Sequence, residues 1–200
     1  MQSPLARITA FIALVLLLGG CGPANSLYAL YDSDDVVSED HLLGSWQPVV
    51  TDPHDSEKDE RWIFAASKNH KFYAFRGGTM GEKGAYVAKA RLVRLGNNLF
   101  IDFAGESEEE ATKDSVVPFP MIATHMIGRV WLEKDTLQIH FLNEDWVKKQ
   151  AEAGAFSLPH LNVDGNQIIT AQTDDLRKFI EAHADDKEAL SVNCDFVRAK

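Results

Sequence analysis

The fold is decided by one stretch in the middle of the chain, AYVAKARLVRL at 85–95, GNN at 96–98 and LFIDF at 99–103. Small or apolar residues at 86, 88, 90 and 92 alternate with a second set at 87, 89, 91 and 93. Leu99, Ile101 and Phe103 alternate in the same way. A period of two is typical of β-strands, and a Gly-Asn-Asn run is typical of a tight turn. The stretch therefore predicts a β-hairpin.

Similar short segments flank this hairpin on both sides. Strands are predicted at 42–50, 61–65 and 71–76 before it, and at 121–133, 136–142, 167–170 and 191–197 after it. Two amphipathic segments interrupt the later strands. We expect helices at 144–153, capped by Asn143, and at 174–184, capped by Thr173. Many short strands with hairpin turns and two late helices predict a mainly β fold, a small antiparallel barrel decorated by helices.

Gly44-Ser45-Trp46, at the head of the first predicted strand, resembles the Gly-x-Trp opening of the lipocalins and their calycin relatives. In that family the Trp closes one end of the barrel, and an Arg from the last strand packs over it. The resemblance implies a lipocalin-like barrel in which Gly44, Trp46 and Arg198 have these structural roles. The region from residue 21 onward also resembles uncharacterised bacterial lipoproteins.

The beginning of the chain has the order of an export signal. Arg7 is followed by an apolar run at 8–18 and then by Leu18-Gly19-Gly20-Cys21. The run is shorter than the roughly 20 residues of a transmembrane helix. Leu18-Gly19-Gly20-Cys21 resembles the lipobox of bacterial lipoproteins. The resemblance implies that Cys21 receives a diacylglycerol and becomes the first residue of the mature protein.

Three segments follow from this interpretation. We expect a lipoprotein signal peptide at 1–20, a lipidated Cys21 with an acidic flexible tether at 21–40, and a single lipocalin-like barrel domain at 41–200. Gly22 follows the cysteine where inner-membrane lipoproteins of enteric bacteria carry Asp, which favours the outer membrane with the domain facing the periplasm. After removal of 1–20 the chain holds 19 basic and 30 acidic side chains, a net charge of −11. That charge opposes nucleic acid as a partner.

Motifs of known chemistry are missing from the sequence. The seven histidines include no His-x-x-x-His pair, and the chain has no Gly-x-Ser-x-Gly elbow. The glycine-rich run at 77–84 lacks Gly-Lys-Ser/Thr, and Asp52-Pro53-His54-Asp55 is interpreted as a turn. We therefore expect no enzyme, no metal and no cofactor. Cys194 is expected to be a buried thiol, with a reactive or intermolecular thiol as the alternative.

The early strands contain more aromatic residues than one face of a narrow barrel needs. An eight-stranded barrel either fills with side chains or leaves room for one small ligand. Two functions stay open. One is binding of a small hydrophobic molecule inside the barrel, and the other is a packed barrel that contacts other envelope proteins through its surface. The predicted ligand-binding residues are Trp62, Phe64, Phe72, Phe75, Tyr86 and Ile101.

Overall fold

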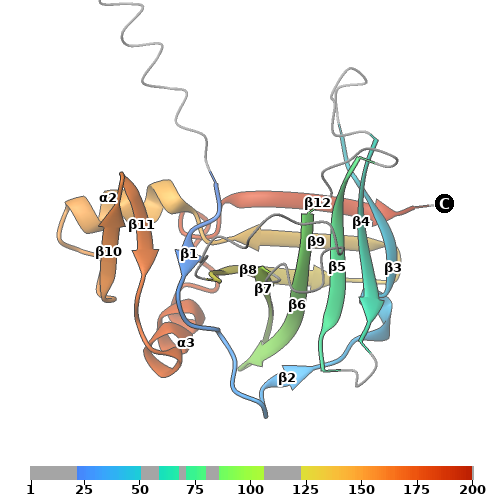
Figure 1. Ribbon diagram of the computed structural model, residues 1–200, viewed down its shortest axis with the longest axis horizontal. Helices are drawn as coiled ribbons and strands as arrows, with labels where there is room; N and C mark the ends of the chain where they lie inside the picture. Colours follow the sequence, from blue (N-terminus) through green and yellow to red (C-terminus); the bar gives the residue numbers. More distant parts are fainter. Residues whose placement is uncertain (1–21, 51–58, 68–70, 80–85, 106–122, 200) are drawn as a thin grey trace, which may run out of the picture.

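Eight antiparallel strands close into a barrel (Figure 1). The structure, a computed structural model, describes residues 22–50, 59–67, 71–79, 86–105 and 123–199. Each barrel strand pairs with the next one in the chain, and the last strand pairs with both β9 and β3, which closes the ring. The prediction of a mainly β, antiparallel barrel is confirmed. The strands are β3 (Gly44–Pro48), β4 (Glu60–Ala66), β5 (Tyr73–Thr79), β6 (Tyr86–Leu95), β7 (Asn98–Gly105), β8 (His125–Leu132), β9 (Thr136–Phe141) and β12 (Val192–Arg198).

The β6–β7 hairpin forms as its alternation predicts. Leu95 pairs with Asn98 across a turn at 96–97, and Gly96 has a φ of +55°, a conformation that glycine adopts without steric cost. Ala90 and Leu92 of β6 and Ile101 of β7 are fully buried inside the barrel. The predicted strands at 121–133 and 136–142 correspond to the β8–β9 hairpin, in which Glu133 N–H donates to the Thr136 carbonyl.

A small side sheet extends from the beginning of β8. There His125 pairs with Ser26 of β1 (Asn25–Ser26), and β1 runs parallel to β11 (Asn166–Ile169). β11 pairs in turn with β10 (His160–Val163), the outermost strand of the order. A further short strand, β2 (Val36–Val37), pairs with β6. β1, β2 and β10 were not predicted from the sequence.

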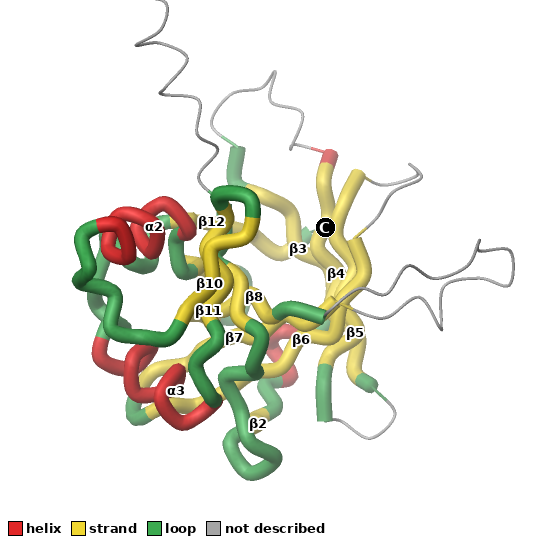
Figure 2. The backbone as a smooth tube through the Cα atoms, turned by 60° about the vertical axis from the view of Figure 1, so that its left-hand side comes forward, coloured by secondary structure: helices red, strands yellow, loops and turns green. Residues whose placement is uncertain are grey.

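Two helices lie on the same side of the barrel as this side sheet, away from β3, β4 and β5 (Figure 2). α2 (Glu144–Glu152) has the predicted cap, because Oδ1 of Asn143 accepts from the backbone N–H groups of Asp145 and Trp146. α3 (Thr173–Ala182) differs from the prediction, since its N-cap is Gln172 and Thr173 is its first residue. The Thr173 hydroxyl donates instead to the carbonyl of Ala29, 2.9 Å away. A 3-10 turn, η1 (Asp40–Leu42), precedes β3.

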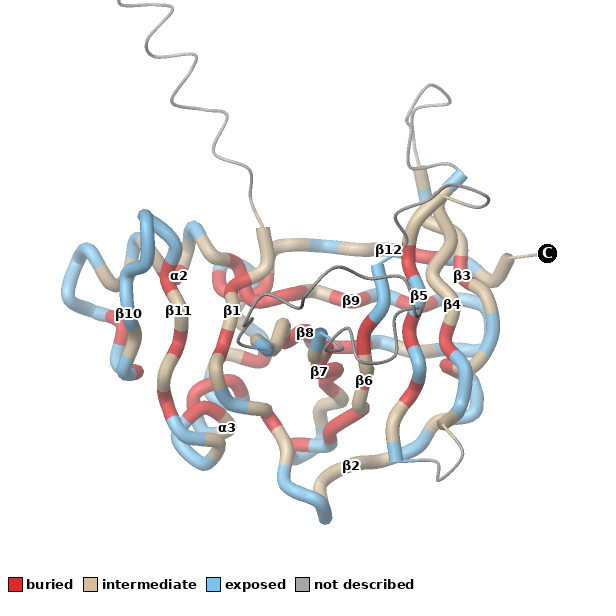
Figure 3. Tube along the Cα trace, viewed as in Figure 1, coloured by how far each residue is buried: buried red, intermediate tan, exposed pale blue. Residues whose placement is uncertain are grey.

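Buried residues form two cores, one on each side of the barrel wall. Figure 3 shows buried residues in the barrel strands and also in α3 and β11. The inner core fills the barrel. The outer core lies between the wall, the helices, the side sheet and the N-terminal segment. Its larger buried members are Leu30, Val93, Leu95, Phe100, Ile127, Leu142, Val147, Phe156, Leu158, Ile169, Leu176, Phe179, Ile180 and Leu190.

The N-terminal segment is packed against the barrel, which corrects the expectation of a flexible tether at 21–40. We call residues 22–37 the N-terminal strap. Leu30 is fully buried in the outer core, and the N–H of Leu27 donates to the Ile169 carbonyl at 2.9 Å. Arg177 of α3 forms ion pairs with Asp35 at 2.7 Å and Asp32 at 3.3 Å. Ala24 and Leu30 of the strap are buried and two of its acids are paired, so the described strap is part of the packed fold.

Candidate functional site

Four of the six predicted ligand-binding residues meet inside the barrel. Trp62, Phe64, Phe75 and Ile101 all belong to the inner core or pack against it. The ring centres of Trp62 and Phe75 are 4.9 Å apart, and those of Phe64 and Phe75 are 5.2 Å apart. Phe103 was not among the predicted residues, yet its ring centre lies 4.9 Å from that of Phe75. Offset and edge-on contacts of this kind are those that aromatic rings prefer.

Phe72 and Tyr86 lie elsewhere. Phe72 immediately precedes β5, whose inward residues begin at Tyr73, so alternation directs Phe72 to the outside. Its ring centre lies 5.5 Å from Nζ of Lys89 and 5.4 Å from Cζ of Arg91, on the outer face of β6. Tyr86 is the first residue of β6 and is 75% exposed. The predicted set is therefore split between the inner core and the surface.

The inner core is tightly filled where the aromatic rings meet. A Cβ placed on Gly77 would lie 2.8 Å from the Phe75 ring, and one on Gly128 would lie 2.7 Å from Ile139. Both glycines therefore provide space that neighbouring side chains already occupy. Among the described residues, the buried polar ones are Ser26, Asp102, Asn143 and Gln167, and none belongs to the inner core. The described part of this interior is therefore filled mainly by apolar and aromatic side chains.

One end of the barrel is closed by Trp46 and Arg198. The two residues are register partners on β3 and β12, and Cζ of Arg198 lies 3.9 Å from the ring centre of the fully buried Trp46. Arg198 also donates to the carbonyls of Leu43 and His41, each at 2.6 Å, and the Trp46 indole N–H donates to the Leu42 carbonyl at 2.9 Å. Arg198 therefore packs over Trp46 and is fixed there by hydrogen bonds. It ties three segments together and closes the barrel end.

A polar pocket of about 310 Å³ opens at this closed end. Glu39 and Arg94 line it and form an ion pair of 3.0 Å. Arg129 also lines it, donating to Oδ1 of Asn98 at 2.8 Å and lying over the ring of Trp131 with Cζ 4.5 Å from the ring centre. Because the two arginines already have partners, the pocket offers hydrogen-bonding groups without an unpaired charge.

The opposite end of the barrel has an apolar rim. β4, β8 and β12 all begin there, since alternate strands of an antiparallel ring run in the same direction. Trp62, Met126 and Val192 lie near these three strand beginnings. All three are partly buried and pack against the inner core. The rim therefore exposes parts of apolar side chains above a filled interior.

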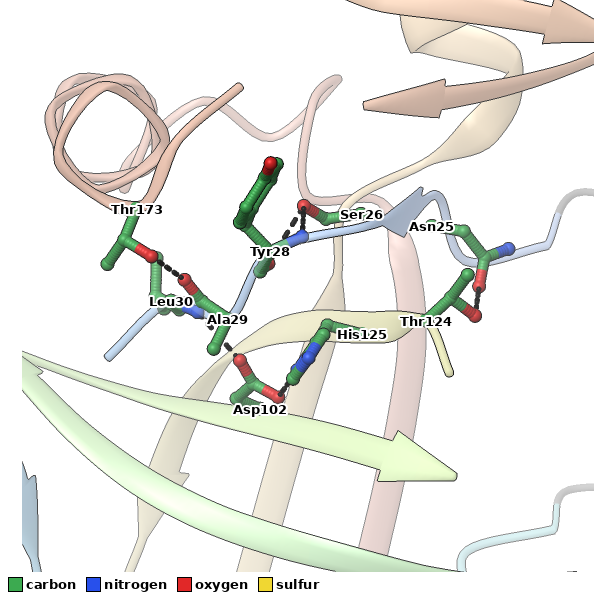
Figure 4. Close-up of polar contacts among 9 residues, drawn as sticks. All are labelled: Asn25, Ser26, Tyr28, Ala29, Leu30, Asp102, Thr124, His125 and Thr173. Carbon is green, nitrogen blue, oxygen red and sulfur yellow. Dashed lines mark hydrogen bonds and ion pairs between the residues drawn. The ribbon is translucent and has the colours of Figure 1, made fainter. Parts of the chain in front are cut away.

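A buried carboxylate fastens the strap to the outside of the barrel (Figure 4). Asp102 of β7 is fully buried, and its Oδ1 lies 2.7 Å from Nδ1 of His125. Its Oδ2 accepts from the backbone N–H of Leu30, also at 2.7 Å. We call Asp102, His125 and Leu30 the strap latch. Each oxygen of the carboxylate has a partner, as burial of such a group requires.

Charged and aromatic groups surround the strap latch. Arg91 is the register partner of Asp102, and its Cζ lies 4.8 Å from the ring centre of Tyr31. The Tyr31 ring centre is 6.5 Å from that of His125. Burial raises the pKa of Tyr31 above its usual value, the Arg91 charge lowers this pKa, and the Asp102 charge raises it. An Asp–His pair can orient an imidazole for proton transfer. Here Asp102 also accepts from Leu30 of the strap, and neither Asp102 nor His125 lines the polar pocket. The geometry of the pair therefore fits a structural role in holding the strap.

Sequence reasoning did not identify the strap latch. No pattern in the sequence pairs His125 with Asp102, which lies 23 residues earlier in the chain. The available signal was Asp102 itself, a single acid within Leu99–Phe103 that shares its face of the strand with Phe100. An acid beside an apolar residue on the outer face of a strand indicates that another segment covers that face.

The remaining sequence predictions concern Cys194, metal ligands, the membrane segment and the loop at 52–55. Cys194 lies on β12 and is partly buried against the inner core. Within the part of the chain that the structure describes, no three His, Cys, Asp or Glu side chains gather as metal ligands, and no helix is long and apolar enough to span a membrane. Cys21 and the segment 52–55 lie outside the described residues.

No family model, curated protein or solved structure matches this chain.

Proposed function

We propose that this protein is a non-enzymatic lipoprotein of the bacterial cell envelope, held at the membrane by lipid on Cys21, whose barrel acts through its outer surface. The observation that carries the second half of this proposal is the filled inner core. Trp62, Phe75 and Phe103 contact one another in the space that a barrel ligand would need. The lipobox resemblance of Leu18-Gly19-Gly20-Cys21 supports the first half.

A ligand inside the barrel is disfavoured because opening the filled inner core costs free energy. Protein interiors are packed as densely as organic crystals, so a ligand can enter only if side chains leave. Removing one large aromatic side chain from a core costs about 3–5 kcal/mol. A ligand inside this barrel would have to repay a cost of that order. A packed barrel avoids it and leaves its surface as the working part, in contact with other envelope components.

A second candidate, binding of a small hydrophobic molecule, is favoured by the apolar rim. Trp62, Met126 and Val192 are partly buried at one end of the barrel and pack on the inner core. A flat apolar molecule bound there would cover the rim without entering the interior. This candidate keeps the hydrophobic ligand but places it above the core.

The anchor is tested by expressing the full chain in a bacterium and measuring the mass of its mature N-terminal peptide. We expect a peptide that begins at Cys21 and carries diacylglycerol, in a protein that partitions into detergent and fractionates with the outer membrane. The matched control, Cys21→Ser, should stay unprocessed and unlipidated. A mature protein with an unmodified N-terminus would contradict the anchor.

The filled core is tested by native mass spectrometry of a chain that begins at Gly22, before and after incubation with lipid extract from the host. We expect the mass of the protein alone in both spectra. Phe103→Ala should create a cavity that binds a small apolar compound such as benzene and raises the melting temperature in its presence. Val87→Ala, on the exposed outer face, should show no such shift. An apolar adduct retained by the wild-type protein would favour the second candidate.

A further inference from the structure

The first described residues of the chain are bound beside α2. The carbonyl of Gly22 accepts from the N–H of Glu144 at 3.0 Å, and the N–H of Ala24 donates to the Leu142 carbonyl at 2.7 Å. Pro23 and Asn143 form a β-bridge between these bonds. Adjacent Cα atoms in a chain are about 3.8 Å apart. Cys21 is the residue next to Gly22 in the sequence, so lipid on Cys21 would be attached one residue away from the described fold.

An apolar surface lies next to this starting point. Asn25 of β1 pairs with Ile168 of β11, and Ile168 pairs with Leu161 of β10. Neighbouring strands are about 4.8 Å apart, so Leu161 lies roughly 10 Å from the strap. Leu161 is 56% exposed and Val163 is 46% exposed.

The two faces of this side sheet differ in burial. Ser26, Gln167 and Ile169 are buried and face the outer core or lie beneath the sheet. Asn25 and Asn166 lie on the opposite face, because Asn25 pairs with Ile168 and Asn166 pairs with Val163. The apolar residues Leu161, Val163, Ile168 and Leu27 lie on that face too and are exposed or partly exposed. We call these four residues the outer sheet face. Exposed apolar residues grouped in this way mark an interaction surface.

We propose that the outer sheet face rests on the lipid bilayer that holds the acyl chains of Cys21. This inference rests on the proposed lipidation. A lipid anchor without a spacer brings the nearest surface of the fold to the membrane, and the outer sheet face is an apolar part of that surface. Apolar side chains are stabilised at the boundary between headgroups and acyl chains.

The chemistry of this contact is apolar. The mature chain has a net charge of −11, and the turn after Val163 begins with the exposed acid Asp164. An acidic protein is not attracted to an anionic lipid surface. The partner that fits is therefore a bilayer of zwitterionic lipid, and salt should have little effect on the contact.

The experiment uses the full lipidated protein in phosphatidylcholine vesicles that contain a photoactivatable lipid with its reactive group on the acyl chain. After illumination, mass spectrometry locates the labelled peptides. We expect labelling of the peptides that contain β1, β10 and β11, and little labelling at β4 and β5, which lie on the opposite side of the molecule (Figure 1). The pattern should be the same at low and high salt.

Matched variants test which residues make the contact. Leu161→Asp combined with Val163→Asp should reduce labelling of the β10–β11 peptide at least about fivefold. The two apolar side chains hold that strand at the membrane by being buried in lipid, and aspartate would not be. Val49→Asp combined with Val197→Asp also replaces two exposed valines and should leave the labelling unchanged. Equal labelling of β10–β11 and β4–β5, or no loss in the first variant, would overturn the inference.

Self-association of the protein and absence of the lipid anchor would each give a result different from the labelling patterns above. Protection of β10 from hydrogen exchange that rises with protein concentration in the absence of vesicles would assign the surface to a second copy of the chain and overturn the inference. An unmodified Cys21 in the N-terminal peptide would overturn the proposed anchor as well, and the peptide mass reports it independently of the labelling.

Discussion

The inner and outer cores share one wall and are built by different means. The inner core comes from the alternate residues of eight strands, and its buried members are apolar. The outer core is assembled from the strap, both helices, the side sheet and the other face of the wall. Beside it lie buried polar groups, among them Asp102. β7 takes part in both, because Ile101 and Phe103 face inward while Phe100 and Asp102 face outward.

The difference shows two ways of specifying a core. Inside a closed barrel, strand geometry decides which residues meet, so apolar side chains of suitable size are enough. Outside, an apolar face accepts any apolar cover, and polar contacts select the correct one. Asp102 accepts specifically from Leu30 N–H, and Thr173 donates specifically to the Ala29 carbonyl. The strap is thereby held in one position.

The largest expected effect is in the inner core. Phe103→Ala removes a nearly fully buried ring that contacts Trp62, Phe64, Phe75 and Phe141. We expect the free energy of unfolding to fall by about 3–5 kcal/mol, measured by equilibrium unfolding in urea. Val87→Ala should change it by less than about 0.5 kcal/mol, because Val87 is exposed. A loss below about 1 kcal/mol for Phe103→Ala would mean that the inner core is loosely packed.

The next effect concerns the strap latch. Asp102→Ala leaves the N–H of Leu30 without its acceptor and His125 without its partner, so we expect a loss of about 2–3 kcal/mol. Asp102→Asn keeps the size and one acceptor oxygen and should lose less. Hydrogen exchange of the Leu30 amide should accelerate in both variants while amides of β4 and β5 keep their protection. Uniform acceleration across the barrel would show that strap and barrel unfold as one unit.

A smaller effect is expected where α3 meets the strap. Thr173→Val removes the hydroxyl that donates to the Ala29 carbonyl and keeps the shape of the side chain. The expected loss is about 1 kcal/mol, since one hydrogen bond contributes about that much. Thr173→Ser retains the hydroxyl and serves as the control. An unchanged free energy of unfolding for Thr173→Val would mean that the hydrogen bond to Ala29 contributes nothing to stability.

The smallest effect depends on pH. Burial raises the pKa of Tyr31 above the usual 10.0, so the folded state holds this proton more tightly than the unfolded state. The stabilisation is complete below the usual pKa and is lost as the pH rises through the higher value of the folded protein. Urea unfolding at several pH values between about 8 and 11 should show a shallower alkaline decline for Tyr31→Phe than for the wild type. Identical declines would place Tyr31 in water in the folded protein.

The sequence predicted the barrel because alternation is a local signal. The period of two at 85–103 and the Asn143 cap of α2 need only a few neighbouring residues to be recognised. The strap was missed because its partners are far away in the chain. Leu30 meets Asp102, and Asp35 meets Arg177, so an isolated segment rich in Asp resembles a solvated tether.

The predicted ligand-binding set was correct only in part, because alternation is a local signal. Trp62, Phe64 and Phe75 were selected as aromatic residues of the early strands, and Ile101 belongs to the alternating set of the hairpin; all four lie in the inner core or pack against it. Phe72 was included for its aromatic character although its parity is opposite to that of Tyr73. Tyr86 has the inward parity but stands at the very beginning of its strand. Local alternation does not show where a strand rises above the rim.

The position of β12 in the ring sets the order of assembly. Phe196 pairs with Pro48, and the same residue pairs with Leu137. The ring therefore stays open until one of the last parts of the chain has been made and has crossed to β3, and pairing over such a sequence separation is slow. Until then β3 and β9 both present unpaired strand edges, which are templates for association with other chains. The newly made protein is most vulnerable to aggregation in the interval before residues 192–198 arrive.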